Sequence, residues 1–157
     1  MRIFELKERK DLIEEAVHVF WKQWGSDDSY LFYKDCMLRS CETEADVPRF
    51  YIAVEQENII GTFALLRNDL NSRQDLTPWL ACLFVHPSYR GMEIGSRFLQ
   101  YALDQAASKG YENVYLATDL EGYYEKYQWN HSTDGYGLDG NPIKVYVQST
   151  ERQGIDS

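Results

Sequence analysis

A loop between an apolar segment and a helical segment carries the residue types of an anion-binding site. The apolar run Trp79–Val85 predicts a buried strand, and Pro87 ends it because proline has no N–H to donate to a sheet. Apolar residues at helical spacing begin at Ile94, so a helix N-terminus with unpaired backbone N–H groups follows the turn. Arg90 adds a fixed positive charge, and Gly91 lets a ligand approach the backbone closely. The sequence therefore predicts a site for a phosphate-bearing ligand.

The residues of this turn also match a known motif. The run from Val85 to Gly95, VHPSYRGMEIG, resembles the acetyl-CoA motif Arg/Gln-x-x-Gly-x-Gly/Ala of the GNAT N-acetyltransferases. Arg90 stands at the first position and Gly95 at the last, whereas Glu93 replaces the middle glycine. In this family the loop N–H groups hold the CoA pyrophosphate, and the preceding strand hydrogen-bonds the pantetheine arm. The resemblance implies that acetyl-CoA is bound by one group of strand and loop residues, Leu83, Phe84, Val85, Arg90, Gly91, Met92, Glu93, Ile94, Gly95 and Ser96.

A tyrosine-rich segment supplies a candidate proton donor. Acetyl transfer from a thioester to an amine needs a neutral amine, a polarised carbonyl and a proton for the departing thiolate, and a phenol with a pKa of about 10 can give that proton. The segment Gly122–Trp129, GYYEKYQW, resembles the family signature Phe-Tyr-Glu-Lys-Leu-Gly-Phe, with Gln128 in place of the glycine. The resemblance implies that Tyr124 is the general acid. The alternative is that Tyr124 only packs under the cofactor.

The general base is harder to assign. Many relatives carry a carboxylate on or near the central strand, but this strand has none, and Asp75 in the preceding loop is the nearest candidate. A loop aspartate also serves as a turn or cap residue, so both interpretations stay open. Cys82 has no activating partner that the sequence identifies, and the resemblance implies direct transfer without an acyl-enzyme. His86 is interpreted as a residue that caps the loop.

The acceptor side is indicated by aromatic residues and by charge. In GNAT proteins the connection between the first two helices borders the acceptor site, which makes Trp24 and Tyr30 candidates for substrate contact, with core packing as the alternative. Trp79, at the start of the central strand, is a third candidate. The net charge of −9 argues against nucleic acid or an anionic membrane as a partner and is compatible with a small cationic amine.

The remaining patterns predict the elements that position these residues. Strands are expected at 2–6, 49–55, 59–66, 79–85, 113–117, 129–136 and 143–148. Helices are expected from 13 to 24, from the candidate caps at 27–29 to about 40, from 94 to 110 and at 121–127. Asp11 and Glu14 have the spacing of a capping box, and Gly25 and Gly110 are expected to end helices. We therefore expect an α/β (α+β) GNAT fold, a mixed central sheet flanked by helices, in one domain over residues 1–157 with a frayed tail at 149–157.

Composition indicates the cellular environment in which the protein is expected to work. No apolar run is long enough to cross a membrane, and the N-terminus does not open a signal-peptide pattern. Cys36, Cys41 and Cys82 show no metal-ligand spacing, which is typical of a reduced cytoplasmic protein without a metal site. Either a monomer or a homodimer is compatible with these patterns.

Two functions remain in competition at this point. The first is an acetyl-CoA-dependent N-acetyltransferase that acts on a primary amine of a small cationic acceptor. The second is a non-catalytic acyl-CoA-binding or regulatory module on the same fold, suggested by Glu93 and by the absence of an acid on the central strand. Turnover of any amine would separate them.

Overall fold

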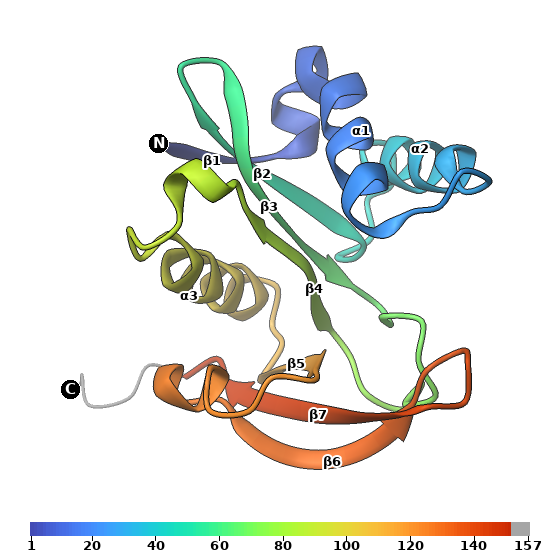
Figure 1. The fold of residues 1–157 in the computed structure, drawn as a ribbon, viewed down its shortest axis with the longest axis vertical. Coiled ribbons are helices and arrows are strands. Elements are labelled where there is room, and N and C mark those ends of the chain that lie inside the picture. Colours follow the sequence, from blue (N-terminus) through green and yellow to red (C-terminus); the bar gives the residue numbers. More distant parts are fainter. Residues whose placement is uncertain (152–157) are drawn as a thin grey trace. The chain divides into compact units, whose positions relative to one another are not determined.

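The computed structural model describes residues 1–151 (Figure 1). In it the chain divides into two compact units. Unit 1 comprises Met1–Ala64 and Cys82–Gly95, and unit 2 comprises Leu65–Ala81 and the chain from Ser96 onward. The strands are β1 (Arg2–Glu5), β2 (Arg49–Glu55), β3 (Asn58–Leu66), β4 (Trp79–Val85), β5 (Asn113–Thr118), β6 (Asn130–Tyr136) and β7 (Pro142–Ser149), and the helices are α1 (Ile13–Trp24), α2 (Tyr30–Ser40) and α3 (Ile94–Ser108). Short 3₁₀ helices include η3 (Pro87–Tyr89) and η4 (Tyr124–Tyr127).

The strands hydrogen-bond in the order β1-β2-β3-β4-β5-β7-β6. The β4–β5 pair is parallel, whereas β1–β2, β5–β7 and β6–β7 are antiparallel, so the sheet is mixed. Strands β3 and β4 and helix α3 each contribute residues to both units. The predicted fold class, a mixed sheet flanked by helices, is confirmed.

Unit 1 is built on the β2–β3 hairpin. Almost every side chain of β2 and β3 is buried, as the continuous apolar runs in both strands predict. Gln56 and Glu57 link the strands with φ values of 51° and 66°, the left-handed pair that a two-residue hairpin turn requires. The first strand, β1, adds to β2 in antiparallel register, with Ile3 opposite Ala53.

Helices α1 and α2 pack beside each other in unit 1 (Figure 1). Helix α1 buries Ala16, Val17 and Phe20 on one face and ends at Gly25, as predicted. The predicted capping box at its start is wrong. Leu12 occupies the N-cap position, and the Asp11 carboxylate instead accepts two hydrogen bonds from Arg9, because a nearby guanidinium is a stronger donor than a backbone N–H.

Unit 2 has β7 at the centre of a three-stranded antiparallel group. Strand β5 pairs with one edge of β7 and β6 with the other, and β6 and β7 form a long curved hairpin (Figure 1). Tyr146 of β7 lies opposite Leu116 of β5 and His131 of β6. The buried core of this unit includes Phe98, Leu99, Ala102, Val114, Leu116, Trp129 and Val145.

The predicted frayed tail is only partly within the described residues. Ser149 still belongs to β7, and Thr150 donates from its backbone N–H to Glu112 O (3.0 Å) and from its hydroxyl to Tyr111 O (2.7 Å). These bonds hold residues 149 and 150 against the segment before β5, so the fraying prediction is wrong for them. Residues 152–157 lie outside the described residues.

Candidate functional site

The turn after β4 is folded back onto the end of its own strand. His86 caps η3, because its Nδ1 accepts a hydrogen bond from the Ser88 backbone N–H (3.1 Å), which confirms the capping interpretation. Arg90 donates from Nε to Val85 O (3.0 Å). Within residues 1–151 no protein atom accepts from its two Nη groups. The guanidinium is thus anchored on one side and keeps two donor groups for a ligand.

The backbone of this turn has two left-handed residues just before a helix N-terminus. Gly91 has φ +82° and Glu93 has φ +62°, and helix α3 begins one residue later at Ile94. Left-handed residues next to a helix N-terminus turn successive N–H groups toward one concavity, which suits a phosphate. Glu93 is exposed. The position at which the acetyl-CoA motif has its middle glycine is therefore left-handed in this chain, although it holds a glutamate.

The two halves of β4, the strand that leads into this turn, differ in burial. Trp79, Leu80 and Ala81 are buried, but Leu83–Val85 are only half-buried, so the prediction of a wholly buried strand is wrong for its second half. The change occurs at Cys82, which has φ +57° and whose carbonyl accepts a hydrogen bond from Thr62 Oγ1 (2.9 Å). A left-handed residue inside a strand interrupts the regular ladder in the manner of a bulge. The half-exposed apolar residues beyond it are available to a ligand.

The α1–α2 connection presents the two aromatic residues predicted for acceptor contact. Trp24 is 40% exposed and Tyr30 is half-buried, with the Tyr30 ring in edge contact with Trp21 (5.4 Å between centroids). Trp21 Nε1 donates to Ser26 O (2.7 Å), and a Cβ at Gly25 would lie 2.5 Å from the Trp21 ring. The connection is therefore closely packed, and its aromatic surface is partly open to solvent.

Tyr124 opens η4 in unit 2 and is mostly removed from water. Burial, and next the neighbouring Tyr123, raise the pKa of Tyr124 to about 12. Its ring stacks edge-on against Tyr123 (4.9 Å) and lies 6.4 Å from the ring of Tyr146. Because its pKa is far above neutrality, the phenol keeps its proton at any physiological pH, as a proton donor must.

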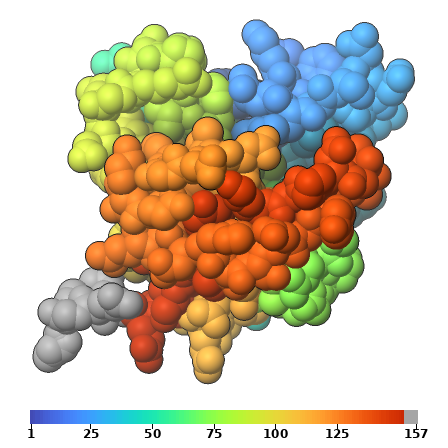
Figure 2. Space-filling view, turned by 60° about the horizontal axis from the view of Figure 1, so that its bottom comes forward, coloured from blue at the N-terminus to red at the C-terminus, as the bar shows by residue number. Residues whose placement is uncertain are grey.

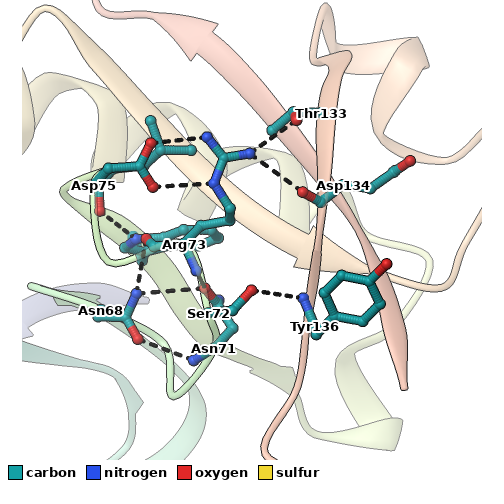
Figure 3. Close-up of polar contacts among 10 residues, drawn as sticks. Asn68, Asn71, Ser72, Arg73, Asp75, Thr133, Asp134 and Tyr136 are labelled. Atoms are coloured by element: carbon teal, nitrogen blue, oxygen red, sulfur yellow. Dashed lines mark hydrogen bonds and ion pairs between the residues drawn. The ribbon is translucent and has the colours of Figure 1, made fainter. Parts of the chain in front are cut away.

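Asp75 serves as the partner of an arginine that joins two segments of unit 2 (Figure 3). Arg73 donates from Nε and Nη2 to the two oxygens of Asp75 (3.0 and 2.8 Å) and from Nη1 to Thr133 Oγ1 (2.8 Å) and Asp134 O (3.2 Å). The hydrogen bond from Arg73 lowers the pKa of the exposed Asp75 carboxyl. A carboxylate with a lowered pKa is a weaker base, so this arrangement favours a structural part for Asp75.

Trp79, the third residue predicted to contact the acceptor, is packed in the core. Its side chain is fully buried, contacts Tyr115 of β5 (6.0 Å between rings), and donates from Nε1 to Leu76 O (2.7 Å). A buried indole with a satisfied N–H is typical of a core residue. This environment favours packing over contact with a substrate.

Asp69 is a loop carboxylate between β3 and β4 that no motif of the sequence includes. It is half-buried, and burial raises its pKa to about 6. The loop around it is fixed, because Asn68 accepts from Asn71 N (2.9 Å) and Ser72 exchanges two hydrogen bonds with Tyr136 of β6 (Figure 3). No sequence signal marks this residue, since its environment depends on how the loop folds.

The other chemical possibilities receive no support from the described chain. Within residues 1–151 no cluster of His, Cys, Asp or Glu side chains has the arrangement of a metal site, and none of the helices there is long and apolar enough to cross a bilayer. All three cysteines are free thiols. Burial raises the pKa of Cys36 and of Cys41, which makes both poor nucleophiles.

Comparison with known proteins gives consistent matches. The model of the acetyltransferase (GNAT) family matches residues 10–128. The chain is 31% identical over 77 residues to an amino-acid acetyltransferase of Shewanella oneidensis, a stretch that covers 49% of this chain and only 16% of that protein. Its fold is similar to the crystal structure of an aminoglycoside 6'-N-acetyltransferase complexed with coenzyme A, with TM-score 0.72 and 17% identity over 99% of this chain and 100% of that one. The aminoglycoside 6'-N-acetyltransferase from Enterococcus faecium is similar to the same degree, with TM-score 0.71, 17% identity, and coverage of 99% and 100%.

Proposed function

Because the chain belongs to the GNAT family of acetyltransferases, we propose that it transfers the acetyl group of acetyl-CoA to a primary amine of a small cationic acceptor. The observation that carries the proposal is the turn between β4 and α3. It combines a guanidinium with two available Nη groups, left-handed residues at Gly91 and Glu93, and a helix N-terminus. That combination suits the pyrophosphate of CoA, and a relative of the same fold was crystallised with coenzyme A.

In this proposal the strand and the turn share the binding of acetyl-CoA. The backbone N–H groups between Arg90 and Ser96 bind the pyrophosphate, and Arg90 neutralises part of its charge. The half-exposed residues Leu83–Val85 bind the pantetheine arm through their backbone. Glu93 tolerates this arrangement because its side chain is exposed.

Tyr124 supplies the proton for the leaving group. The acceptor amine first loses its ammonium proton to solvent, and its nitrogen then bonds to the thioester carbonyl carbon. The C–S bond breaks, the thiolate takes the phenolic proton, and the attacking nitrogen loses one further proton to solvent, from which the Tyr124 phenolate is reprotonated. With a pKa of about 12, Tyr124 is a weaker acid than an ordinary phenol, but it is fully protonated before each cycle and so holds the proton that the thiolate takes. Asp75 is left out of the chemistry, because its ion pair with Arg73 lowers its pKa.

The acceptor assignment rests on charge and on relatives. The net charge is −9, and carboxylates lie in the α1–α2 connection, between α2 and β2, and between β3 and β4, namely Asp27, Asp28, Glu42, Glu44, Asp46, Asp69 and Asp75. Two relatives of the same fold are named for aminoglycosides, which are polycationic amines. Trp24 and Tyr30 provide aromatic surface for such an acceptor.

A panel of amines tests the proposal. The protein is incubated with acetyl-CoA and with polyamines, amino sugars, amino-acid amides and neutral aromatic amines, and the release of free thiol is followed. Turnover is expected with at least one cationic amine, and acetyl-CoA is expected to raise the melting temperature. Gly95→Asp places bulk and negative charge at the turn and should abolish both effects. Stabilisation by acetyl-CoA without turnover of any amine would instead favour the non-catalytic acyl-CoA-binding module.

The role of Tyr124 has a separate test. Tyr124→Phe keeps the ring and its packing but removes the proton, so kcat should fall by about 10²-fold or more. The dissociation constant for acetyl-CoA, measured by calorimetry, should change by less than about 2-fold, because the phenol proton is used only in the reaction. An unchanged kcat would return Tyr124 to the packing role.

A further inference from the structure

A hydrogen bond inside unit 2 connects η4, the short helix that carries Tyr124, to β7, the central strand of that unit. Tyr146 OH donates to Glu125 Oε2 (2.7 Å), and Glu125 directly follows Tyr124 in η4. Tyr146 is only 2% exposed and lies on β7, where strands pair on both sides. The Tyr146 hydroxyl is therefore carried by a buried side chain on a strand that is paired along both edges. Figure 2 shows the orange segment that carries η4 lying against the red β7.

A second contact joins β7 to a glutamate just before η4. Lys144 Nζ contacts Glu121 Oε1 at 2.9 Å. Lys144 and Tyr146 are two residues apart on β7, so they point to the same face of the strand. Their partners, Glu121 and Glu125, flank the segment that contains Tyr124. The two contacts differ in burial, because the Lys144 and Glu121 side chains are 42% and 78% exposed, so the tyrosine–glutamate bond is the stronger tether.

The protonation states keep this bond intact at neutral pH. The hydrogen bond from Tyr146 lowers the pKa of Glu125, and the same bond raises the pKa of Tyr146. Glu125 is thus a carboxylate and Tyr146 a neutral phenol across the physiological range. The centroid of the Tyr146 ring also lies 6.4 Å from that of the Tyr124 ring. Tyr146 therefore lies beside Tyr124 through its ring and is bonded to the helix of Tyr124 through its hydroxyl.

We propose that Tyr146 and Glu125 are positioning residues, which hold η4 so that the Tyr124 hydroxyl stays at one place. The inference rests on the proposed function, in which Tyr124 protonates the thiolate. Neither residue touches the reacting atoms, and both act through Tyr124. A proton donor displaced by about 1 Å can lose on the order of 10²-fold in rate, which is why a tether outside the reaction matters.

A double-mutant cycle tests this coupling. Tyr146→Phe keeps the ring and removes the hydroxyl, so kcat should fall about 10-fold while KM for acetyl-CoA stays within about 2-fold. In a Tyr124→Phe background the same change should have no further effect on kcat, because the group that it positions is gone. An equal loss in both backgrounds would overturn the proposal, since it would show that Tyr146 acts on the rate without Tyr124. Full activity of Tyr124→Phe alone would contradict the acid role itself, and the cycle reports that outcome separately.

A measurement that needs no acceptor complements the cycle. With tyrosines labelled at ¹³Cζ, the Tyr124 resonance is assigned by its loss in Tyr124→Phe. It should be a single sharp signal in the unmodified protein at pH 7 and should broaden or divide in Tyr146→Phe and in Glu125→Ala. Glu125→Gln keeps an acceptor oxygen and should restore most of the sharp signal. The matched control is Lys144→Met, which removes the exposed contact from the same face of β7. If Lys144→Met changes the resonance and kcat as much as Tyr146→Phe does, β7 supports the helix only in general and the assignment to Tyr146 is wrong.

Discussion

At the scale of single residues, Glu93 is the position where this chain departs from its family and from ordinary backbone preference. Its φ of +62° costs an L-residue about 1–2 kcal/mol, whereas a glycine there would instead cost about 0.5–1 kcal/mol in backbone entropy. Glu93→Gly should therefore change stability little. It also removes a negative charge beside the proposed pyrophosphate site, so acetyl-CoA should bind as tightly as before or more tightly. Calorimetric titration measures this, and a clear loss of affinity would show that Glu93 contributes to the site.

Asp69 gives a prediction with a definite sign. Its folded-state pKa of about 6 lies above the ordinary value of 3.8, so between these values the folded protein binds more protons than the unfolded chain. The free energy of unfolding should then fall as the pH rises through this window and stay level above it. Asp69→Asn removes the buried charge and should stabilise the protein by about 1–2 kcal/mol at pH 7.5, an effect that fades by pH 4.

Urea denaturation at the two pH values measures the effect of Asp69→Asn. Asp75→Asn is the matched comparison, because the Arg73 contact lowers the pKa of Asp75. Its contribution is present at neutral pH and is lost as the pH falls, so this substitution should destabilise the protein at pH 7.5. A destabilising effect of Asp69→Asn at neutral pH would mean that the ionised carboxylate has a partner or a ligand role.

Residue patterns predicted some of these environments and not others. The turn residues Arg90 and Gly91 were predictable, because their conformation depends on neighbours in the sequence. The environments of Asp69 and Trp79 were not, since burial of a loop carboxylate or a strand indole depends on segments far away in the chain. The tether between Glu125 and Tyr146 spans 21 residues, and no spacing rule marks such a pair.

At the scale of elements, the loop of residues 68–75 is held to β6 by Arg73. The guanidinium joins Asp75 in its own loop to Thr133 and to the Asp134 carbonyl on the strand (Figure 3). Arg73→Met keeps much of the side-chain volume but removes all of these bonds. The melting temperature should fall by a few degrees, and limited proteolysis should cut the loop faster. Thr133→Val removes one acceptor only and should have a smaller effect. An unchanged melting temperature in Arg73→Met would show that the hydrogen bonds between Ser72 and Tyr136 are enough to hold the loop.

Element boundaries were predictable wherever the pattern was local. The apolar runs defined β2, β3 and β4 to within a residue, and Gly25 marked the end of α1. Two of the failures share one cause, which is competition between hydrogen-bond partners. Asp11 binds Arg9 instead of capping α1, and Thr150 bonds to the segment before β5 instead of fraying. Which partner wins depends on distances that the sequence does not contain.

At the scale of the whole molecule, the excess of acidic residues is the property with a functional consequence. A net charge of −9 sets up a negative potential that attracts cations and repels anionic partners. Asp27 and Asp28, in the loop between α1 and α2, are exposed, as are Glu42, Glu44 and Asp46. Exposed charges act through solvent, so their influence is sensitive to salt.

This sensitivity provides the test of a cationic acceptor. If the field concentrates the amine near the protein, KM for the best cationic amine should rise several-fold between about 0.02 M and 0.5 M ionic strength, as the screening length falls from about 20 Å to 4 Å. KM for a neutral aromatic amine serves as the control and should not change. Asp27→Asn/Asp28→Asn should reduce the salt dependence without altering kcat, because these carboxylates act before the reaction. A preferred acceptor that is anionic or uncharged, with KM indifferent to salt, would show that the acidic loops serve only solubility.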